Sequence, residues 1–423
     1  MFETQKIFSQ ANTMVLHPTL KVDQYSDSEL AFRLEEAVGL AHAIHLTIIH
    51  QEVLKLSDFR PSTFITKGKV EGLKEKIKEL EIELVIVDHD ITPIQQKNLE
   101  GAWECKVIDR TGLILEIFGE RAATREGLLQ VELASLEYQK GRLVRTWTHL
   151  ERQRGGFGFM GGPGESQIEA DRRLIRERIA RIKGLLETVV RTRELHRKSR
   201  RQVPYPVIAL VGYTNAGKST LFNALTGADV LVENKLFATL DPTMRVVKLP
   251  SGRNIILSDT VGFVSRLPTQ LVAAFRATLE EVVEADLLLH VRDISHPQTE
   301  EQKDDVEQVI KSLGIHDKYH HHTIEVLNKI DRLECMPPIS NAIPVSAAKR
   351  INLDLLLDHI DNRLKDANIV QEVTIPYTDG KIIAWIYEHA EIISRQDTEE
   401  SIQFILRISD KHWAHLKLML PQS

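Results

Sequence analysis

Apolar residues alternate between helical and strand-like spacing over the first 120 residues of the chain. Spacing of three and four residues predicts helices over 28–44, 69–80 and 92–104, and apolar, β-branched runs predict strands over 45–54, 84–90 and 106–118. This alternation is typical of a small α/β domain, which we place at residues 1–120.

The next stretch carries two long helical repeats. The first series comprises Leu129, Leu133, Leu136 and Leu143, and the second comprises Ile168, Ile175, Ile179, Ile182, Leu186 and Val189. Two such apolar seams predict an antiparallel helical hairpin over 121–203. Pro163-Gly164 separates the two helices, and the capping-box pattern Ser166-x-x-Glu169 predicts where the second begins. The tip is rich in glycine, with six in the ten residues 155–164.

Strand and helix patterns resume after the second helix. Pro204 and Pro206 end the hairpin, and the following patterns predict another α/β domain over 204–366. The last region, 370–423, reads as strand, helix, strand and helix, and predicts a small α+β domain. It is too short for a large core of its own, so we expect it to dock on a neighbour.

A glycine-rich loop lies at the start of the second α/β domain. The segment GYTNAGKS, from Gly212 to Ser219, matches G-x-x-x-x-G-K-[ST] and stands between an apolar strand and a helix. In such a motif Gly217 would let the backbone approach phosphate, and we expect Lys218 to reach the β- and γ-phosphates and Ser219 to ligate Mg²⁺. The predicted phosphate-binding residues are Gly212, Tyr213, Thr214, Asn215, Ala216, Gly217, Lys218, Ser219 and Thr220.

Three short motifs follow in order, each at the end of a predicted strand. The first, Asp259-x-x-Gly262, offers a carboxylate to Mg²⁺ through water and an N–H to the γ-phosphate. In the second, Asn328-Lys329-x-Asp331, the Asp331 carboxylate can accept hydrogen bonds from two guanine N–H donors that adenine lacks. In the third, Ser346-Ala347-Ala348, the backbone can contact the base. The predicted residues are Asp259, Thr260, Val261, Gly262, Asn328, Lys329, Ile330, Asp331, Ser346, Ala347 and Ala348.

This order of motifs resembles the Ras-like, translation-factor class of GTPases. The resemblance implies a Ras-like P-loop fold for residues 204–366, and it places Thr239 as the switch I threonine that completes Mg²⁺ coordination, with Thr243 as the competing candidate. The neighbours Phe237, Ala238, Leu240 and Asp241 are then also expected beside the nucleotide. The predicted catalytic residues are Lys218, Thr239 and Gly262, which position and stabilise the γ-phosphate during attack by water.

Phe263 occupies the place where Ras-type enzymes carry a water-orienting glutamine. A phenyl ring cannot hydrogen-bond to the attacking water, so we expect slow intrinsic hydrolysis that a partner or another element accelerates. An apolar residue at this place, together with asparagine at the position of Asn215, resembles the pattern of GTPases that use K⁺ for charge stabilisation. Asn215 is therefore a candidate K⁺ ligand, or a residue that only stabilises the loop.

Charge is distributed unevenly along the chain. The whole sequence carries a net charge of −6, yet residues 139–201 hold 17 Lys or Arg against 7 Asp or Glu. Such a basic block fits either a polyanionic partner or a solvated helix face rich in ion pairs. If the partner is an RNA, as the family resemblance given below implies, the predicted RNA-binding residues are Arg154, Phe157, Phe159, Arg172, Arg173 and Arg176. The two phenylalanines either stack on unpaired bases or form an apolar cap on the hairpin.

Cysteine content and apolar runs bear on the compartment. Cys105 and Cys335 are far apart and form no metal-binding pattern, and no apolar run approaches the ~20 residues of a membrane span. The first ten residues lack the pattern of a signal peptide. We expect a cytoplasmic monomer with no membrane span, which associates peripherally with a membrane or, as the family resemblance given next implies, with ribosomes.

The chain as a whole resembles the HflX family of ribosome-associated GTPases. The resemblance rests on GGPGESQIEADRRLIRERI, GYTNAGKSTLFNALT, LFATLDPT, SDTVGFVSRLP and FRATLEEV. It implies a GTPase that uses Mg²⁺, binds the large ribosomal subunit and its RNA when carrying GTP, splits stalled or idle ribosomes under stress, and leaves after hydrolysis. Two other readings are a P-loop kinase of small molecules, which Asn328 and Asp331 argue against, and an RNA-binding scaffold without useful turnover.

Overall fold

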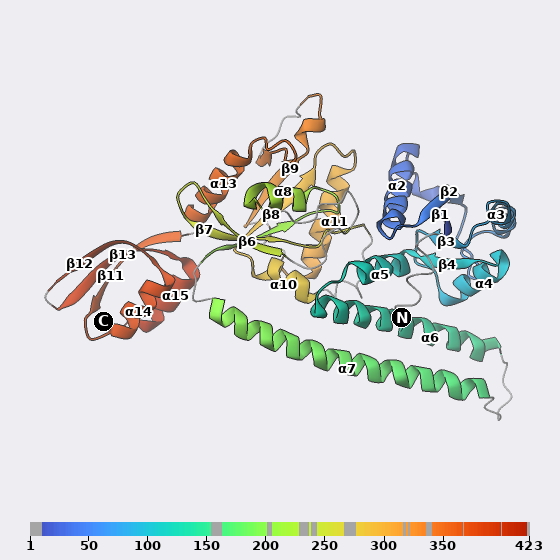
Figure 1. Cartoon of the computed structure of the whole chain (residues 1–423), viewed down its shortest axis with the longest axis horizontal. Helices are drawn as coiled ribbons and strands as arrows, with labels where there is room; N and C mark the ends of the chain where they lie inside the picture. Colours follow the sequence, from blue (N-terminus) through green and yellow to red (C-terminus); the bar gives the residue numbers. More distant parts are fainter. Residues whose placement is uncertain are drawn as a thin grey trace.

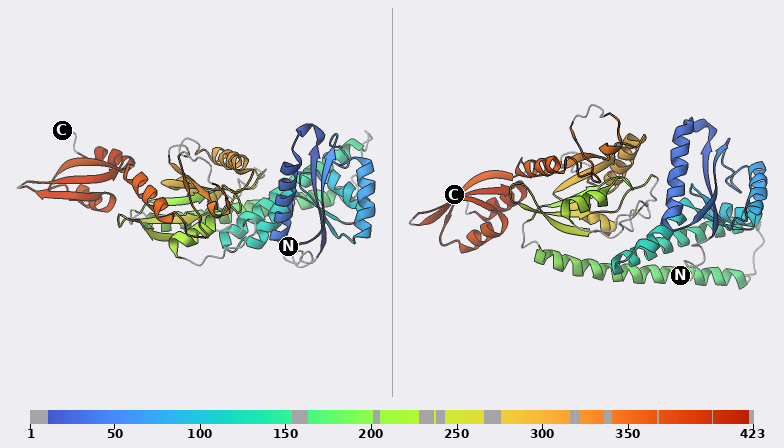
Figure 2. Two further views of the ribbon diagram at one scale, coloured as in Figure 1. Left: turned by 90° about the horizontal axis from the view of Figure 1, so that it is seen from above. Right: turned by 45° about the horizontal axis from the view of Figure 1, so that its top comes forward.

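The computed structural model arranges the chain as two α/β domains, a helical hairpin and a small C-terminal domain (Figure 1). The hairpin runs along one side of both α/β domains, and the C-terminal domain lies at the end of the molecule away from the N-terminal domain (Figure 2). This confirms the predicted fold class. The structure describes residues 11–153, 163–200, 205–227, 237, 243–265, 276–315, 319, 322–335, 341–366, 368–398 and 400–420.

The N-terminal domain is built on a parallel sheet of strand order β2-β1-β3-β4. Apolar clusters cover both faces of the sheet, and helix α2 begins with a capping box between Ser26 and Glu29. Its elements are β1 (Asn12–Leu20), a 3₁₀ turn η1 (Lys21–Asp23), α2 (Asp27–Ala43), β2 (Thr47–Leu56), α3 (Lys67–Glu79), β3 (Leu84–Val87), α4 (Pro93–Trp103), β4 (Lys106–Asp109) and α5 (Arg110–Arg121).

The strand predicted over 106–118 is wrong beyond Asp109. Strand β4 ends there, and the Asp109 carboxylate accepts the N–H of Gly112 at 2.8 Å, which caps helix α5. The apolar residues that follow recur at three- and four-residue spacing, so one helix face is buried: Leu113, Ile114, Ile117 and Phe118.

The hairpin consists of α6 (Arg125–Gln153) and α7 (Pro163–Arg200), which lie antiparallel (Figure 1). Their seam contains the predicted residues Leu129, Leu133, Leu136, Ile175, Ile179, Ile182 and Leu186. The side chains of Leu143 and Ile168 lie outside the described part. Helix α7 begins at Pro163, one turn before the predicted cap Ser166, because proline is favoured in the first turn of a helix.

The second α/β domain has a six-stranded sheet of order β10-β9-β8-β5-β7-β6, parallel except for β6. This order places β5 near the centre, so the loop after it lies at the middle of the sheet edge. The elements are β5 (Val207–Val211), α8 (Lys218–Thr226), β6 (Thr243–Lys248), β7 (Asn254–Asp259), α10 (Arg276–Glu284), β8 (Leu287–Asp293), α11 (Thr299–Ser312), β9 (Thr323–Asn328), η2 (Ile330–Arg332), β10 (Ala342–Pro344) and α13 (Leu353–Asp366).

The C-terminal domain has an antiparallel sheet of order β11-β13-β12 with its own apolar core. Its elements are β11 (Asn368–Pro376), α14 (Gly380–His389), β12 (Glu391–Asp397), β13 (Ser401–Ser409) and α15 (Asp410–Met419). Strand β12 was not predicted. None of the helices among the described residues is long and apolar enough to cross a bilayer.

Candidate nucleotide site

The P-loop leaves strand β5 at a glycine that the neighbouring strand requires. Gly212 has a φ of 151°, and a β-carbon at this residue would lie 2.2 Å from the carbonyl oxygen of Val291 on β8. Any other residue would therefore collide with the backbone of the sheet. This close approach is what lets the loop turn over the edge of the sheet toward helix α8.

Gly217, the second P-loop glycine, is packed against Asn328. It has a φ of 93°, and its β-carbon would lie 2.2 Å from Nδ2 of Asn328. That amide group donates to the carbonyl of Ala216 at 2.9 Å, while Oδ1 of Asn328 accepts the N–H of Ala347 at 3.0 Å. One asparagine thus ties together three of the predicted motifs.

Lys218 is a buried cation at the N-terminus of α8. Its Nζ donates to the carbonyl oxygens of Gly212 at 3.0 Å and Tyr213 at 2.8 Å. Burial lowers the pKa of Lys218 to about 8; the Asp259 carboxylate opposes this shift and the Lys329 cation adds to it. An ammonium group held by carbonyl oxygens beside a helix N-terminus is well placed to bind phosphate oxygens.

Ser219 and Asp259 lie close together below the loop. The Ser219 hydroxyl donates to Oδ2 of Asp259 at 2.7 Å, and Asp259 is fully buried. A hydroxyl and a carboxylate are hard oxygen donors of the kind that Mg²⁺ prefers, so these residues fit a magnesium ion. A bound Mg²⁺ would neutralise charge on the phosphates during hydrolysis.

The Asp259-x-x-Gly262 motif pairs with the P-loop along its backbone. Thr214 donates its N–H to the carbonyl of Phe263 at 2.6 Å, and Phe263 donates its N–H to the carbonyl of Gly212 at 3.1 Å. A β-carbon on Gly262 would lie 3.0 Å from Nζ of Lys218 and 2.9 Å from Cγ2 of Thr214. The backbone of Gly262 therefore lies beside the lysine ammonium, where an N–H can reach the terminal phosphate.

The Asn328-Lys329-x-Asp331 motif positions an exposed carboxylate at the end of β9. The Ser346 hydroxyl donates to Oδ1 of Asp331 at 2.6 Å, and Asp331 remains exposed to solvent. Lys329 pairs with Asp293 at 2.7 Å and donates to the carbonyl of Asn215, also at 2.7 Å. A carboxylate fixed in this way can accept two N–H groups from one edge of guanine.

Other predicted residues belong to the segments next to these motifs. The Thr260 hydroxyl donates to the carbonyl of Leu210 at 2.5 Å, and Val261 and Phe237 are buried. Asn215 is exposed and has a positive φ of 59°. The remaining members with a described position are Thr220 in α8, Ile330 in η2 and the exposed Ala348. Ala238, Thr239, Leu240 and Asp241 lie outside the described residues.

The predicted RNA-binding residues belong to the hairpin. Arg173 and Arg176 are exposed on α7, and Arg172 is half-buried. Arg173 approaches Glu177 at 3.9 Å, an exposed ion pair that contributes little stability. Arg154, Phe157 and Phe159 lie outside the described residues.

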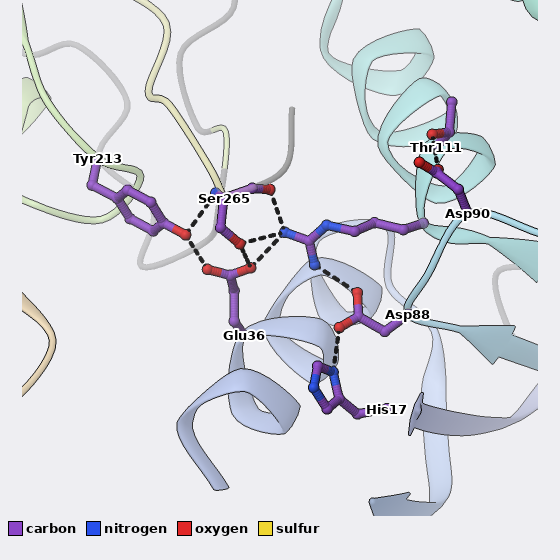
Figure 3. Close-up of polar contacts among 8 residues, drawn as sticks. His17, Glu36, Asp88, Asp90, Thr111, Tyr213 and Ser265 are labelled. Atoms are coloured by element: carbon purple, nitrogen blue, oxygen red, sulfur yellow. Dashed lines mark hydrogen bonds and ion pairs between the residues drawn. The ribbon is translucent and has the colours of Figure 1, made fainter. Parts of the chain in front are cut away.

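A polar cluster that the sequence analysis missed joins the P-loop to the N-terminal domain (Figure 3). The Tyr213 hydroxyl donates to Glu36 of α2 and accepts the N–H of Ser265 at 2.7 Å. Arg110, the first residue of α5, donates to Glu36 at 2.5 Å and to the carbonyl of Ser265 at 2.9 Å. No spacing in the sequence links these residues, because only tertiary packing brings them together.

The buried charges of this cluster compensate one another. Arg110 also donates to Asp88 at 2.6 Å, and His17 bonds to the same carboxylate at 2.7 Å. Burial alone lowers the pKa of Arg110, but the charges of Asp88 and Glu36 outweigh it and raise that pKa. Burial alone raises the pKa of Asp88, and Arg110 and His17 reverse the shift, so both groups stay charged.

Comparison with known proteins covers almost the whole chain. Residues 31–119 match a family model described as GTP-binding GTPase N-terminal, and residues 121–200 match GTP-binding GTPase Middle Region. Residues 207–329 match 50S ribosome-binding GTPase, and residues 335–422 match HflX C-terminal domain.

Several curated proteins are similar over most of their length, each named GTPase HflX. The protein from Magnetococcus marinus is 51% identical over 89% of this chain and 88% of its own. Those from Caldanaerobacter subterraneus subsp. tengcongensis and Escherichia coli (strain K12) are 46% and 42% identical, over 89% and 84% of this chain and 86% and 85% of their own. Together with the P-loop, the Asn328-Lys329-x-Asp331 motif and the four-part fold, this similarity shows that the chain is a GTPase and belongs to the HflX family.

Proposed function

We propose that the protein binds the large ribosomal subunit when it carries GTP and dissociates stalled or idle ribosomes, and that hydrolysis releases it. The observation that carries this proposal is the match of residues 207–329 to a ribosome-binding GTPase model, in a chain that also carries a basic helical hairpin, called the arm below. The similar proteins are named for their GTPase activity. The proposal thus has a general part, binding of the large ribosomal subunit, and a more specific part, ribosome splitting.

The helical hairpin is the proposed RNA-binding element. Its block of 17 basic and 7 acidic residues between 139 and 201 lies in a chain of net charge −6. Neutralising RNA phosphates with these side chains releases counterions, so binding should weaken steeply as salt rises. The glycine-rich tip would allow the backbone to approach an irregular RNA surface, and Arg154, Phe157 and Phe159 would contact it.

The proposed chemistry is in-line attack of water on the γ-phosphorus. Lys218 and Gly262 would bind the terminal phosphate, and Ser219, Thr239 and, through water, Asp259 would hold Mg²⁺. The support is the buried ammonium beside Gly262 and the 2.7 Å contact between Ser219 and Asp259. Asn328 and Asp331 would select guanine, with the backbone of 346–348 beside the base.

Charge reversal on the arm tests the ribosome proposal. The double variant Arg172→Glu, Arg173→Glu should lose sedimentation with isolated large subunits at moderate salt and lose subunit-stimulated GTP hydrolysis, while its affinity for GDP stays unchanged. A matched control, Lys248→Glu with Lys311→Glu, makes the same charge change at exposed positions of the GTPase domain. Equal sedimentation of both variants and the unmodified protein would contradict an RNA role for the arm.

Light scattering of intact ribosomes tests the splitting step. Addition of the protein with a non-hydrolysable GTP analogue should lower the scattering as ribosomes separate, and GDP should have no effect. Binding to large subunits without any loss of scattering would leave ribosome association intact and overturn splitting. Large subunits that bind the protein without accelerating hydrolysis would instead favour a scaffold in which nucleotide only changes shape.

Asn215 is the proposed ligand of a potassium ion beside the phosphates. It is exposed and has left-handed backbone geometry at the middle of the loop. Turnover of GTP with large subunits should be faster in K⁺ than in Na⁺, and Asn215→Ala should remove the difference. Equal rates in the two salts would sink this assignment.

A further inference from the structure

We propose that the Thr214 hydroxyl holds the attacking water against the γ-phosphoryl group, the role that Phe263 cannot fill. This hydroxyl lies in the P-loop beside Gly262, and among the residues that the structure describes it has no hydrogen-bond partner. The inference deepens the hydrolysis proposed above and rests on the position given there to the terminal phosphate. It makes Thr214 a catalytic residue for that reaction.

The side chain of Thr214 is buried without a partner for its oxygen. Thr214 is 6% exposed, and its hydroxyl makes no hydrogen bond within the described part of the chain. A hydroxyl can donate one hydrogen bond and accept two, so leaving all three unmade in a buried place is unfavourable. An unsatisfied polar group of this kind at a phosphate-binding loop indicates a bound molecule that completes it.

The contacts of Thr214 place its side chain next to the proposed site of the terminal phosphate. Its N–H donates to the carbonyl of Phe263 at 2.6 Å, which holds the two segments together. A β-carbon on Gly262 would lie 2.9 Å from Cγ2 of Thr214 and 3.0 Å from Nζ of Lys218. The methyl group and the hydroxyl share one β-carbon, so the hydroxyl also stands beside Gly262, whose N–H is proposed to contact the γ-phosphate.

Other hydroxyl groups of the P-loop and the neighbouring segment are already engaged. Ser219 donates to Asp259 at 2.7 Å, and Thr260 donates to a carbonyl of strand β5 at 2.5 Å. The Tyr213 hydroxyl bonds to a glutamate of α2. Of these described hydroxyls, that of Thr214 therefore has the unused hydrogen-bonding capacity that a bound water needs.

Phe263 itself is fixed in the apolar core. Its ring is 1% exposed and belongs to the cluster that contains Phe237 and Val264. Turning the ring out toward the phosphates would expose a large apolar surface, which is unfavourable. The ring also has no group that could bind water, so another side chain must position the nucleophile.

A hydroxyl at this place can bind both reacting groups at once. It donates a hydrogen bond to an oxygen of the γ-phosphoryl group and accepts one from the water, which aligns the water for in-line attack. The water oxygen bonds to phosphorus as the bond to the β–γ bridging oxygen breaks, and the electron pair of that bond stays on GDP. One water proton passes to an oxygen of the transferred phosphoryl group, so Thr214 keeps its own proton and inorganic phosphate leaves.

Single-turnover hydrolysis of GTP by the full chain, measured in K⁺ without ribosomes, tests this inference. Thr214→Val removes the hydroxyl and keeps the branched shape, so the rate at saturation should fall about 100-fold, as when one hydrogen bond to a transition state is removed. Thr214→Ser keeps the hydroxyl and should recover most of the rate. Thr323→Val is the matched control, because Thr323 also has an unpaired hydroxyl, at the end of β9 away from the nucleotide.

Nucleotide affinities separate a catalytic role from a structural one. Thr214→Val should bind a non-hydrolysable GTP analogue about tenfold more weakly and GDP with unchanged affinity, because GDP lacks the phosphate that the hydroxyl contacts. An unchanged rate, a loss of GDP affinity as large as the loss of rate, or a Thr214→Ser protein as slow as Thr214→Val would overturn the inference. Slow hydrolysis by Thr323→Val would overturn it too, since any loss of packing would then suffice. Ribosome binding is untouched by these outcomes, and hydrolysis by the unmodified protein reports separately on the proposed chemistry.

Discussion

Replacing Gly217 with alanine should weaken nucleotide binding through Asn328. A left-handed alanine costs roughly 1–2 kcal/mol. Its β-carbon would lie 2.2 Å from Nδ2 of Asn328, so the asparagine must move away from Ala216 and Ala347. The two lost hydrogen bonds add about 1 kcal/mol each. These costs together reach about 4 kcal/mol, and the nucleotide must restore the relaxed empty loop, which weakens GDP binding by up to about 700-fold.

Titration with a fluorescent GDP analogue measures this effect, and Gly227→Ala is the matched control. Gly227 ends helix α8 with a φ of 66° and has no atom within 4 Å of its β-carbon position, so it carries the backbone cost without the collision. Since Asn328→Ala makes room for the new methyl group, adding it to Gly217→Ala should give less than the sum of the two losses. Equal GDP affinities for the two glycine variants would refute this reasoning.

Three further predictions concern Lys218, His290 and Ile182. Burial lowers the pKa of Lys218 to about 8, so the nucleotide-free protein loses this charge above pH 8. GDP affinity should therefore stay constant near pH 7 and then decrease as the pH rises, by up to about tenfold per pH unit. A GDP affinity that stays unchanged up to about pH 9.5 would contradict this. Lys218→Ala should bind nucleotide weakly at every pH. Burial lowers the pKa of His290 to about 3 in the folded protein, against about 6.5 in the unfolded chain. The stability that neutral His290 contributes is therefore complete above about pH 6.5 and decreases as the pH is lowered, by about 2 kcal/mol at pH 5. Hydrogen exchange in β8 should show this loss, and His290→Asn should abolish it. Ile182→Ala should destabilise the hairpin by about 2–5 kcal/mol and leave GDP binding unchanged, as thermal melting and titration would show.

The nucleotide site was predictable because its parts are short local motifs at strand ends. The P-loop and the segment around Asn328 each specify their own backbone geometry, and a parallel sheet brings such strand ends together. The cluster of Arg110, Glu36 and Tyr213 was not predictable, since its members are distant in sequence and carry no motif. The burial of Arg110 marks this cluster, but that burial becomes visible only once the fold is known.

The fold was predictable where one face of an element is buried. The hairpin seam recurs at helical spacing, and the amphipathic helices α2 and α3 show the same pattern. Strand β1 escaped prediction because it is buried on both faces and therefore has no alternation, and it contains Pro18. Helix α5 was mistaken for strand because its dense apolar residues mask their three- and four-residue spacing.

Helix α7 gives the molecule a mechanical lever. Its 38 residues at 1.5 Å each make a rod of about 57 Å, whose C-terminal end leads toward strand β5. A tilt of about 10° at that end would sweep the Pro163 end through about 10 Å. A displacement of ångströms at the end of α7 near strand β5 would therefore become a shift of about a nanometre at the far end of the hairpin.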